Sequence, residues 1–159
     1  MSGNFNAEDT LTVSPDARIL VVDDNAQNLE LLQAYLEDLG CQIDLARDGA
    51  EAIEIAKQRV PDVMVLDVMM PRMSGFQVCE KLKKDPATSS VPIVMVTALN
   101  EISDVERAIE AGADDFLTKP VQRLELLARV KSQINVQQIR RRLELAIRRL
   151  RELDQGAAS

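Results

Sequence analysis

Short apolar runs alternate with helical repeats along most of the chain, and this alternation constrains the fold more than any other feature. Residues 19–22, 63–66 and 93–96 are uninterrupted apolar runs, the pattern of strands that are buried on both faces. Two further strands are predicted at 42–46 and 115–117. Strands separated by helices favour parallel pairing with right-handed crossovers. The sequence therefore predicts an α/β fold, an open doubly wound sheet of five parallel strands with helices on both faces.

The predicted helices lie between these strands and carry start and stop signals. The first has leucines at three- and four-residue spacing and stops at Gly40, since glycine commonly follows a helix. Asp48, with Glu51 three residues later, predicts a capping box at the start of the second. The third and fourth helices are predicted at 76–84 and 102–111.

Polar side chains follow the predicted strands at the points where the strands end. Asp23 and Asp24 follow the first strand, Asp67 the third and Thr97 the fourth, and Lys119 lies just past the fifth. Function collects at the carboxyl ends of the strands in an open parallel sheet. Carboxylates this close raise each other's pKa unless a cation intervenes, and oxygen ligands alone favour Mg²⁺. An alternative role for Asp24 is to cap the first helix.

Composition narrows the possible chemistry. The chain has no histidine, which excludes a His-based zinc site, a Ser-His-Asp nucleophile and a phosphohistidine donor. Cys41 and Cys79 are too few and too isolated for a disulfide framework, so we expect reduced thiols in a cytoplasmic protein. No apolar stretch approaches 20 residues, so we expect no membrane insertion.

Four motifs resemble the receiver domain of two-component response regulators, over about residues 18–134. They are VVDDN at 21–25, VLDVMMPRMSG at 65–75, VTALN at 96–100 and AGADDFLTKP at 111–120. The resemblance implies a flavodoxin-like fold, here with an extended last helix. It also implies a protein that receives a phosphoryl group from a histidine kinase or a histidine phosphotransfer protein. Such a protein is no enzyme toward other molecules, because it catalyses only its own phosphorylation and dephosphorylation.

The resemblance also assigns the acceptor and the metal ligands. Asp67 would be the phosphoacceptor. Asp24 would bind Mg²⁺ together with Asp67 and the backbone carbonyl of Met69, and Asp23 would act through a metal-bound water.

Further residues would contact the phosphoryl group or respond to it. By the same resemblance, Lys119 would contact the phosphoryl oxygens, Thr97 would move its hydroxyl toward them, and Phe116 would follow as the switch aromatic. The rearrangement would signal to a downstream protein that the sequence does not identify. Met69 lies two residues after Asp67, and Leu99 lies two residues after Thr97. Neither can orient an attacking water, so we predict a long-lived phosphorylated state.

The final helix is long and basic. Residues 121–159 hold nine Lys and Arg against four Asp and Glu, a net charge of +5, whereas the first 120 residues carry −12. Because no Gly or Pro intervenes between Val121 and Gly156, we predict about 33 residues of helix, about 50 Å long. The predicted divisions are a disordered tail at 1–17, the receiver at 18–134, a helical extension at 135–155 and a second tail at 156–159.

Apolar residues of the extension recur at alternating three- and four-residue spacing. They are Val136, Ile139, Leu143, Ala146, Leu150 and Leu153. This is the a/d seam of a left-handed coiled coil, in which Arg149 would face Asp154 of the other chain in a parallel pair. A homodimer is therefore predicted, and the alternative is an amphipathic helix that folds onto its own domain or frays.

Two other functions stay open at this point. The arginines of the last helix could make the chain a DNA-binding regulator, although no helix-turn-helix pattern or interleaved aromatic residues support nucleic acid as a partner. A Mg²⁺-dependent aspartyl-phosphate phosphohydrolase could also use such a sheet. That class typically has a second Asp where Met69 stands here.

Overall fold

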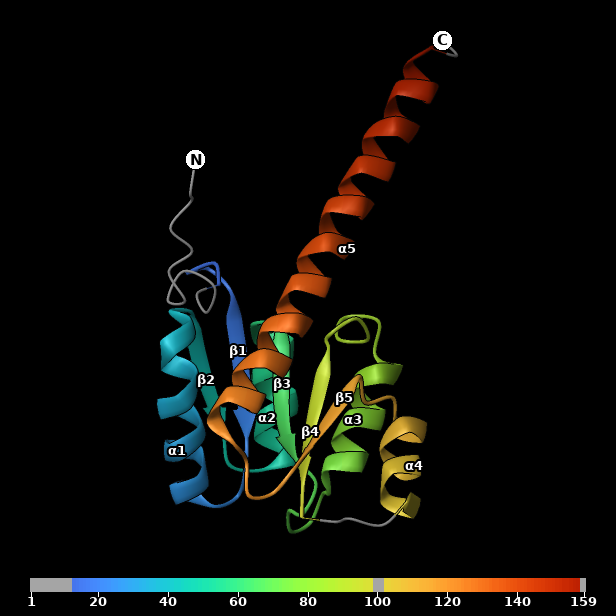
Figure 1. Cartoon of the computed structure of the whole chain (residues 1–159). Helices are drawn as coiled ribbons and strands as arrows, with labels where there is room; N and C mark the ends of the chain where they lie inside the picture. The colour runs from blue at the N-terminus through green and yellow to red at the C-terminus, as the bar shows by residue number, and fades with distance from the viewer. Residues whose placement is uncertain (1–12, 99–101, 158–159) are drawn as a thin grey trace, which may run out of the picture.

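The structure is a computed structural model, and it describes residues 13–98 and 102–157. Five parallel strands form one sheet in the order β2-β1-β3-β4-β5, as Figure 1 shows. The strands are β1 (Arg18–Val22), β2 (Gln42–Ala46), β3 (Val63–Asp67), β4 (Ile93–Thr97) and β5 (Asp115–Thr118). The helices are α1 (Ala26–Leu36), α2 (Gly49–Gln58), α3 (Gly75–Lys84), α4 (Ile102–Ala111) and α5 (Arg123–Ala157). The predicted fold class is confirmed, and the strand order is the flavodoxin-like one.

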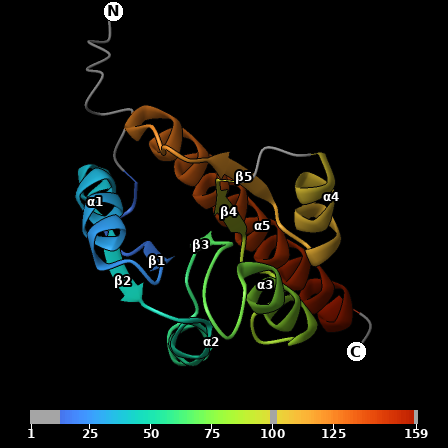
Figure 2. The same ribbon diagram turned by 90° about the horizontal axis from the view of Figure 1, so that it is seen from below.

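The sheet separates two apolar cores, because successive strand residues point to opposite faces. On β1, Leu20 and Val22 belong to the core that α2, α3 and α4 cover. Ile19 and Val21 belong to the core that α1 and α5 cover. Figure 2 shows these two groups of helices on either side of the strands. Burial on both faces explains why the strands read as uninterrupted apolar runs.

Helices α2, α3 and α4 start within one residue of the predicted positions, but the capping of α2 and α3 differs from the prediction. Asp48 caps α2 by accepting the Glu51 N–H at 2.8 Å. The Glu51 carboxylate accepts from the Arg47 N–H at 3.1 Å rather than from Asp48, so the predicted capping box is only half formed. A complete box stands instead at α3, between Ser74 and Gln77.

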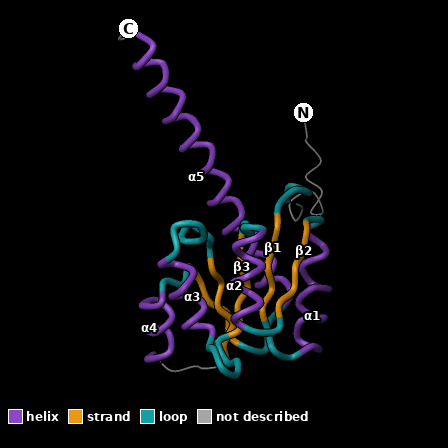
Figure 3. The backbone as a smooth tube through the Cα atoms, turned by 180° about the vertical axis from the view of Figure 1, so that it is seen from behind, coloured by secondary structure: helices purple, strands orange, loops and turns teal. Residues whose placement is uncertain are grey.

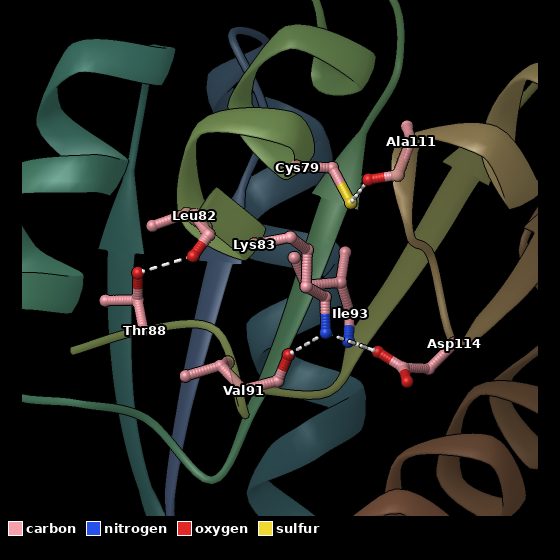
Figure 4. A network of polar contacts seen from close by, with 8 residues as sticks. All are labelled: Cys79, Leu82, Lys83, Thr88, Val91, Ile93, Ala111 and Asp114. Atoms are coloured by element: carbon pink, nitrogen blue, oxygen red, sulfur yellow. Dashed lines mark hydrogen bonds and ion pairs between the residues drawn. The ribbon is translucent and has the colours of Figure 1, made fainter. Parts of the chain in front are cut away.

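A polar network fastens α3 to the starts of β4 and β5 (Figure 4). Lys83 Nζ donates to the Val91 carbonyl at 2.7 Å and pairs with the Asp114 carboxylate at 3.0 Å. The same carboxylate accepts the Ile93 N–H at 2.8 Å.

Cys79 lies on the buried side of α3. Burial raises the pKa of its thiol to about 11, so the thiol stays protonated at neutral pH. Both cysteines are free, and Cys79 has the properties of a core residue.

Contacts with the domain begin before β1. The Val13 N–H donates to the Leu39 carbonyl at 3.1 Å, and Ala17 is buried. Val13 and Ala17 of the predicted tail thus contact the domain. Residues 1–12, Leu99 and residues 158–159 lie outside the described residues.

Helix α5 packs on the sheet and then continues beyond it. It has 35 residues, starts two residues later than predicted, and includes Gly156. Figures 1 and 3 show it leaving the domain at the edge of the sheet where β1 and β3 begin. Arg141 of this helix pairs with Asp62, the residue before β3, with 2.6 Å between Nη1 and Oδ1. In the described part of the chain, no helix is both long and apolar enough to cross a membrane.

Candidate functional site

The site lies where the strand order reverses. Strand β1 lies between β2 and β3 in the sheet. The connection that follows β1 leads to β2 on one side, whereas the connection that follows β3 leads to β4 on the other side. The carboxyl ends of two such strands border a crevice in which open α/β sheets bind ligands. Asp23 directly follows β1, and Asp67 is the last residue of β3.

Three carboxylates converge at this crevice. One oxygen from each of Asp23, Asp24 and Asp67 lies within 4.8 Å of the others. Asp23 and Asp67 are 1% and 3% exposed, whereas Asp24 is open to solvent. An all-oxygen donor set of this kind suits Mg²⁺, which binds through one or two carboxylates and retains positions for water and phosphate.

One buried oxygen of the cluster lacks a hydrogen bond. Asp23 Oδ1 accepts the Asn25 N–H at 2.9 Å, but Asp23 Oδ2 has no hydrogen-bond partner among the described residues. Buried polar atoms are almost always satisfied, and each exception needs an explanation. A cation between the carboxylates would satisfy this oxygen, so the residues present fit a bound Mg²⁺.

Lys119 reaches the same carboxylates from β5. Its Nζ lies 3.3 Å from Asp67 Oδ1 and 3.9 Å from Asp23 Oδ2. Its backbone N–H donates to the Thr97 carbonyl at 2.8 Å, which anchors the lysine to the end of β4. The ammonium group is therefore held next to Asp67, where it can contact an anion bound at that carboxylate.

The pKa of Asp67 lies above its ordinary value. Burial is the main cause, and repulsion from Asp23 adds to it. Lys119 and the Met69 N–H, which is 3.4 Å from Asp67 Oδ1, lower the pKa but do not offset the rise. An added cation would favour the ionised carboxylate that a nucleophile requires.

The loop after Asp67 depends on Gly75. The Gly75 N–H donates to the Val68 carbonyl at 2.9 Å. A Cβ at this position would lie 2.3 Å from the Asp67 carbonyl oxygen, so only glycine permits this close approach. The sequence contains Gly75 within the third-strand motif but gives it no role. Met69, on the same loop, is exposed.

The structure settles the alternative for Asp24. Asn25 caps α1, since its Oδ1 accepts the N–H groups of Gln27 and Asn28 at 2.9 and 3.1 Å. The suggestion that Asp24 caps this helix is therefore wrong, and its carboxylate is not used as a cap.

Two further predicted residues lie on β4 and β5. Thr97 is buried at the end of β4, opposite Thr118 of β5 in the strand register. Phe116 is exposed and lies two positions earlier on β5, opposite Met95. Leu99 lies outside the described residues. Of the predicted site residues, the structure brings four side chains together: Asp23, Asp24, Asp67 and Lys119.

Comparison with known proteins identifies the family. The family model of the response regulator receiver domain matches residues 19–131. The chain belongs to this family. It is therefore a receiver of two-component response regulators, and neither the DNA-binding alternative nor the phosphohydrolase is favoured.

Curated relatives agree with this assignment. The chain is 49% identical over 116 residues to the response regulator PleD of Caulobacter vibrioides, covering 73% of this chain and 26% of PleD. It is 41% identical over 115 residues to RpaA of Synechocystis, a DNA-binding dual master transcriptional regulator, covering 72% of this chain and 48% of RpaA. The chain thus spans less than half the length of either relative.

Solved structures resemble the same part of the chain. A putative response regulator from Chloroflexus aurantiacus matches with a TM-score of 0.72 and 34% identity, covering 76% of this chain and 98% of that one. The receiver domain of a sensor histidine kinase from Pseudomonas aeruginosa matches with a TM-score of 0.70 and 30% identity, with the same coverage. That structure has a magnesium ion coordinated in its active-site cleft.

Proposed function

We propose that this receiver accepts a phosphoryl group on Asp67 and signals through a change of conformation and protein contact. The observation that carries the proposal is the position of Asp67, a buried carboxylate at the crevice with the Lys119 ammonium 3.3 Å away. The donor would be the phosphohistidine of a histidine kinase or a phosphotransfer protein. Because the chain has no histidine of its own, it would act only as the receiving side.

The metal ligands of this proposal are those implied by the family resemblance. Asp24, Asp67 and the Met69 carbonyl would hold Mg²⁺ directly, and Asp23 would act through a bound water. The clustered oxygens and the unsatisfied Asp23 Oδ2 support this assignment. When bound, the ion would supply positive charge against the phosphoryl oxygens.

The transfer itself is a displacement at phosphorus. A carboxylate oxygen of Asp67 would attack in line, the P–N bond to the donor imidazole would break, and its electron pair would stay on the imidazole nitrogen. Lys119 would contact the phosphoryl oxygens and offset their charge, which is the main catalytic requirement of such transfers. Water would later hydrolyse the acyl phosphate at the same site, so catalysis would be limited to this chain's own modification.

The signal would arise at the neighbouring strand ends. Thr97 would turn its hydroxyl toward the phosphoryl group, and Phe116 would then change its position on β5. The phosphoryl group would have to favour one of two existing arrangements to have this effect. The exposure of Phe116 on the outer strand of the sheet supports a role in contacts with a downstream protein. A cytoplasmic location, expected from the reduced cysteines, stays a prediction.

The proposal is tested by incubating the purified chain with acetyl phosphate. We expect a mass gain of one phosphoryl group in the presence of Mg²⁺ and none in EDTA, measured on the intact protein. Peptide mapping after borohydride reduction of the acyl phosphate should place the group on Asp67. A gain that does not need Mg²⁺, or that maps to another residue, would contradict the proposal.

The lifetime of the phosphorylated state provides a separate prediction. Met69→Asn, and likewise Leu99→Gln, should speed the loss of the phosphoryl group on the order of tenfold, which corresponds to about 1.4 kcal/mol of barrier. The reason is that an amide can orient water, whereas the exposed Met69 thioether next to Asp67 cannot. Decay would be followed by intact mass after removal of the donor.

The control for this measurement is Arg72→Asn. It places the same amide in the same loop, at an exposed residue with a φ of 69°, a conformation that Asn tolerates. Its decay should match that of the wild type. Unchanged decay in both Met69→Asn and Leu99→Gln would show that neither side chain controls hydrolysis.

A further inference from the structure

One face of helix α5 packs against the receiver domain. The buried residues of this face are Leu126, Leu127, Val130, Ile134 and Gln137. The same face ends at Arg141, whose pair with Asp62 ties the helix to the start of β3. Asp62 is itself fixed, because its Oδ2 accepts the Arg18 N–H at 2.7 Å. These contacts fix the rotation of the helix relative to the sheet.

The apolar seam of α5, defined by the six residues 136, 139, 143, 146, 150 and 153, lies on the opposite face. Leu143 follows Ile134 by nine residues, and Leu150 follows Arg141 by nine. Nine residues are two and a half turns of an α-helix, so the two members of each pair point in opposite directions. The same nine-residue offset relates Val136 to Leu127.

This geometry leaves the seam uncovered by its own domain. Its five large side chains are 37–69% exposed, and Ala146 is exposed as well. The helix could turn the seam onto the sheet only by withdrawing Ile134, Gln137 and the Arg141 ion pair from the contacts they make. An apolar stripe of this length therefore needs a partner from outside the chain.

We propose that the partner is a second copy of this chain, aligned in parallel along the seam. The alternating three- and four-residue spacing is self-complementary, since each a or d side chain fits between four residues of an identical helix. In the parallel arrangement, Arg149 at position g faces Asp154 at position e of the other copy, which is an attractive contact. No like-charged g–e pair occurs in this register.

The antiparallel arrangement is less favourable for the same residues. With the a and d layers matched, it places Arg142 of one copy against Arg142 of the other across the centre of the seam. Repulsion between these two arginines disfavours the antiparallel pair, because charges that flank the seam determine how the two helices align.

The pairing also fixes where the two domains lie. Because the seam and the domain-facing side are opposite sides of α5, each receiver lies on the outer flank of the helical pair. The two receivers do not have to touch for the pair to form, so pairing along the seam need not cover Phe116 or the exposed Asp24. This inference goes beyond the proposed phosphoryl transfer and does not depend on it.

Sedimentation of the full chain over a range of concentrations tests the seam. We expect wild type to form a dimer, and Leu143→Lys and Leu150→Lys to raise the dissociation constant at least tenfold. The matched control is Leu145→Lys, the same change on the same helix at a residue that is 52% exposed but lies off the seam. Circular dichroism spectra and thermal unfolding curves like those of the wild type would show that the variants fold.

Two outcomes would overturn the inference. One is a wild-type chain that stays monomeric at every concentration, and the other is an equal loss of dimer in Leu145→Lys. The direction of pairing is tested with Leu150→Cys in a Cys41→Ser background, treated with diamide. A parallel pair places the two introduced thiols side by side and should cross-link, whereas Leu145→Cys should not. A dimer that persists without a cross-link at position 150 would overturn the parallel arrangement.

Discussion

Asp67→Asn should abolish acceptance of a phosphoryl group from acetyl phosphate. The amide that replaces the carboxylate is no nucleophile at neutral pH, and it has nearly the same size, so the surrounding contacts should persist. The variant should therefore show no mass gain under conditions that fully convert the wild type. Asp23 is the other buried carboxylate of the cluster, but it lies farther from the Lys119 Nζ, at 3.9 Å against 3.3 Å for Asp67.

A matched control comes from the same edge of the sheet. Asp48 follows β2 and caps α2, and Asn is as good an N-cap as Asp. Asp48→Asn makes the same change from Asp to Asn and removes the same single negative charge, outside the acidic cluster. It should retain phosphoryl acceptance. Wild-type levels of phosphorylation in Asp67→Asn would mean that another residue is the acceptor.

The strands could be predicted because their patterns are local. The three uninterrupted apolar runs differ from β1, β3 and β4 by one residue at the ends. The structure extends β3 to Asp67 and β4 to Thr97, so these polar residues are part of the hydrogen-bonded ladder. Their convergence could also be predicted, since the carboxyl ends of parallel strands meet at one edge.

The parts that could not be predicted depend on contacts between distant segments. The strand order places β1 next to β3, and no local pattern contains that information. The need for Gly75 arises only because the loop brings its backbone against the Asp67 carbonyl. The pair of Arg141 with Asp62 joins residues far apart in the sequence, and it determines which face of α5 is free.

Mg²⁺ should stabilise the wild-type fold against heat. A ligand that binds only the native state, at a hundred times its dissociation constant, adds about 2.7 kcal/mol of stability. For a chain of this size that corresponds to a rise of about 5–10 °C in Tm. The physical reason is that Asp23 and Asp67 are buried carboxylates within reach of each other, and a cation removes their repulsion.

Without Mg²⁺, Asp67→Asn should be more stable than the wild type at neutral pH. Burial and the charge of Asp23 raise the pKa of Asp67, so ionisation of Asp67 favours the unfolded state. This cost is fully present above the raised pKa and disappears as the pH falls below the ordinary range of Asp, where the carboxyl is protonated in both states. The stability advantage of the variant in EDTA should therefore shrink as the pH is lowered.

Thermal unfolding followed by circular dichroism, in Mg²⁺ and in EDTA, measures both effects on the same variants. Asp67→Asn and Asp24→Asn should each lose most of the Mg²⁺-dependent rise in Tm, because each removes a carboxylate from the cluster. Asp48→Asn lies outside the cluster and should keep the rise. Asp24 is exposed and does not cap α1, so its replacement should leave the Tm in EDTA nearly unchanged. An equal Mg²⁺ effect in wild type and Asp24→Asn would place the ion at a different site.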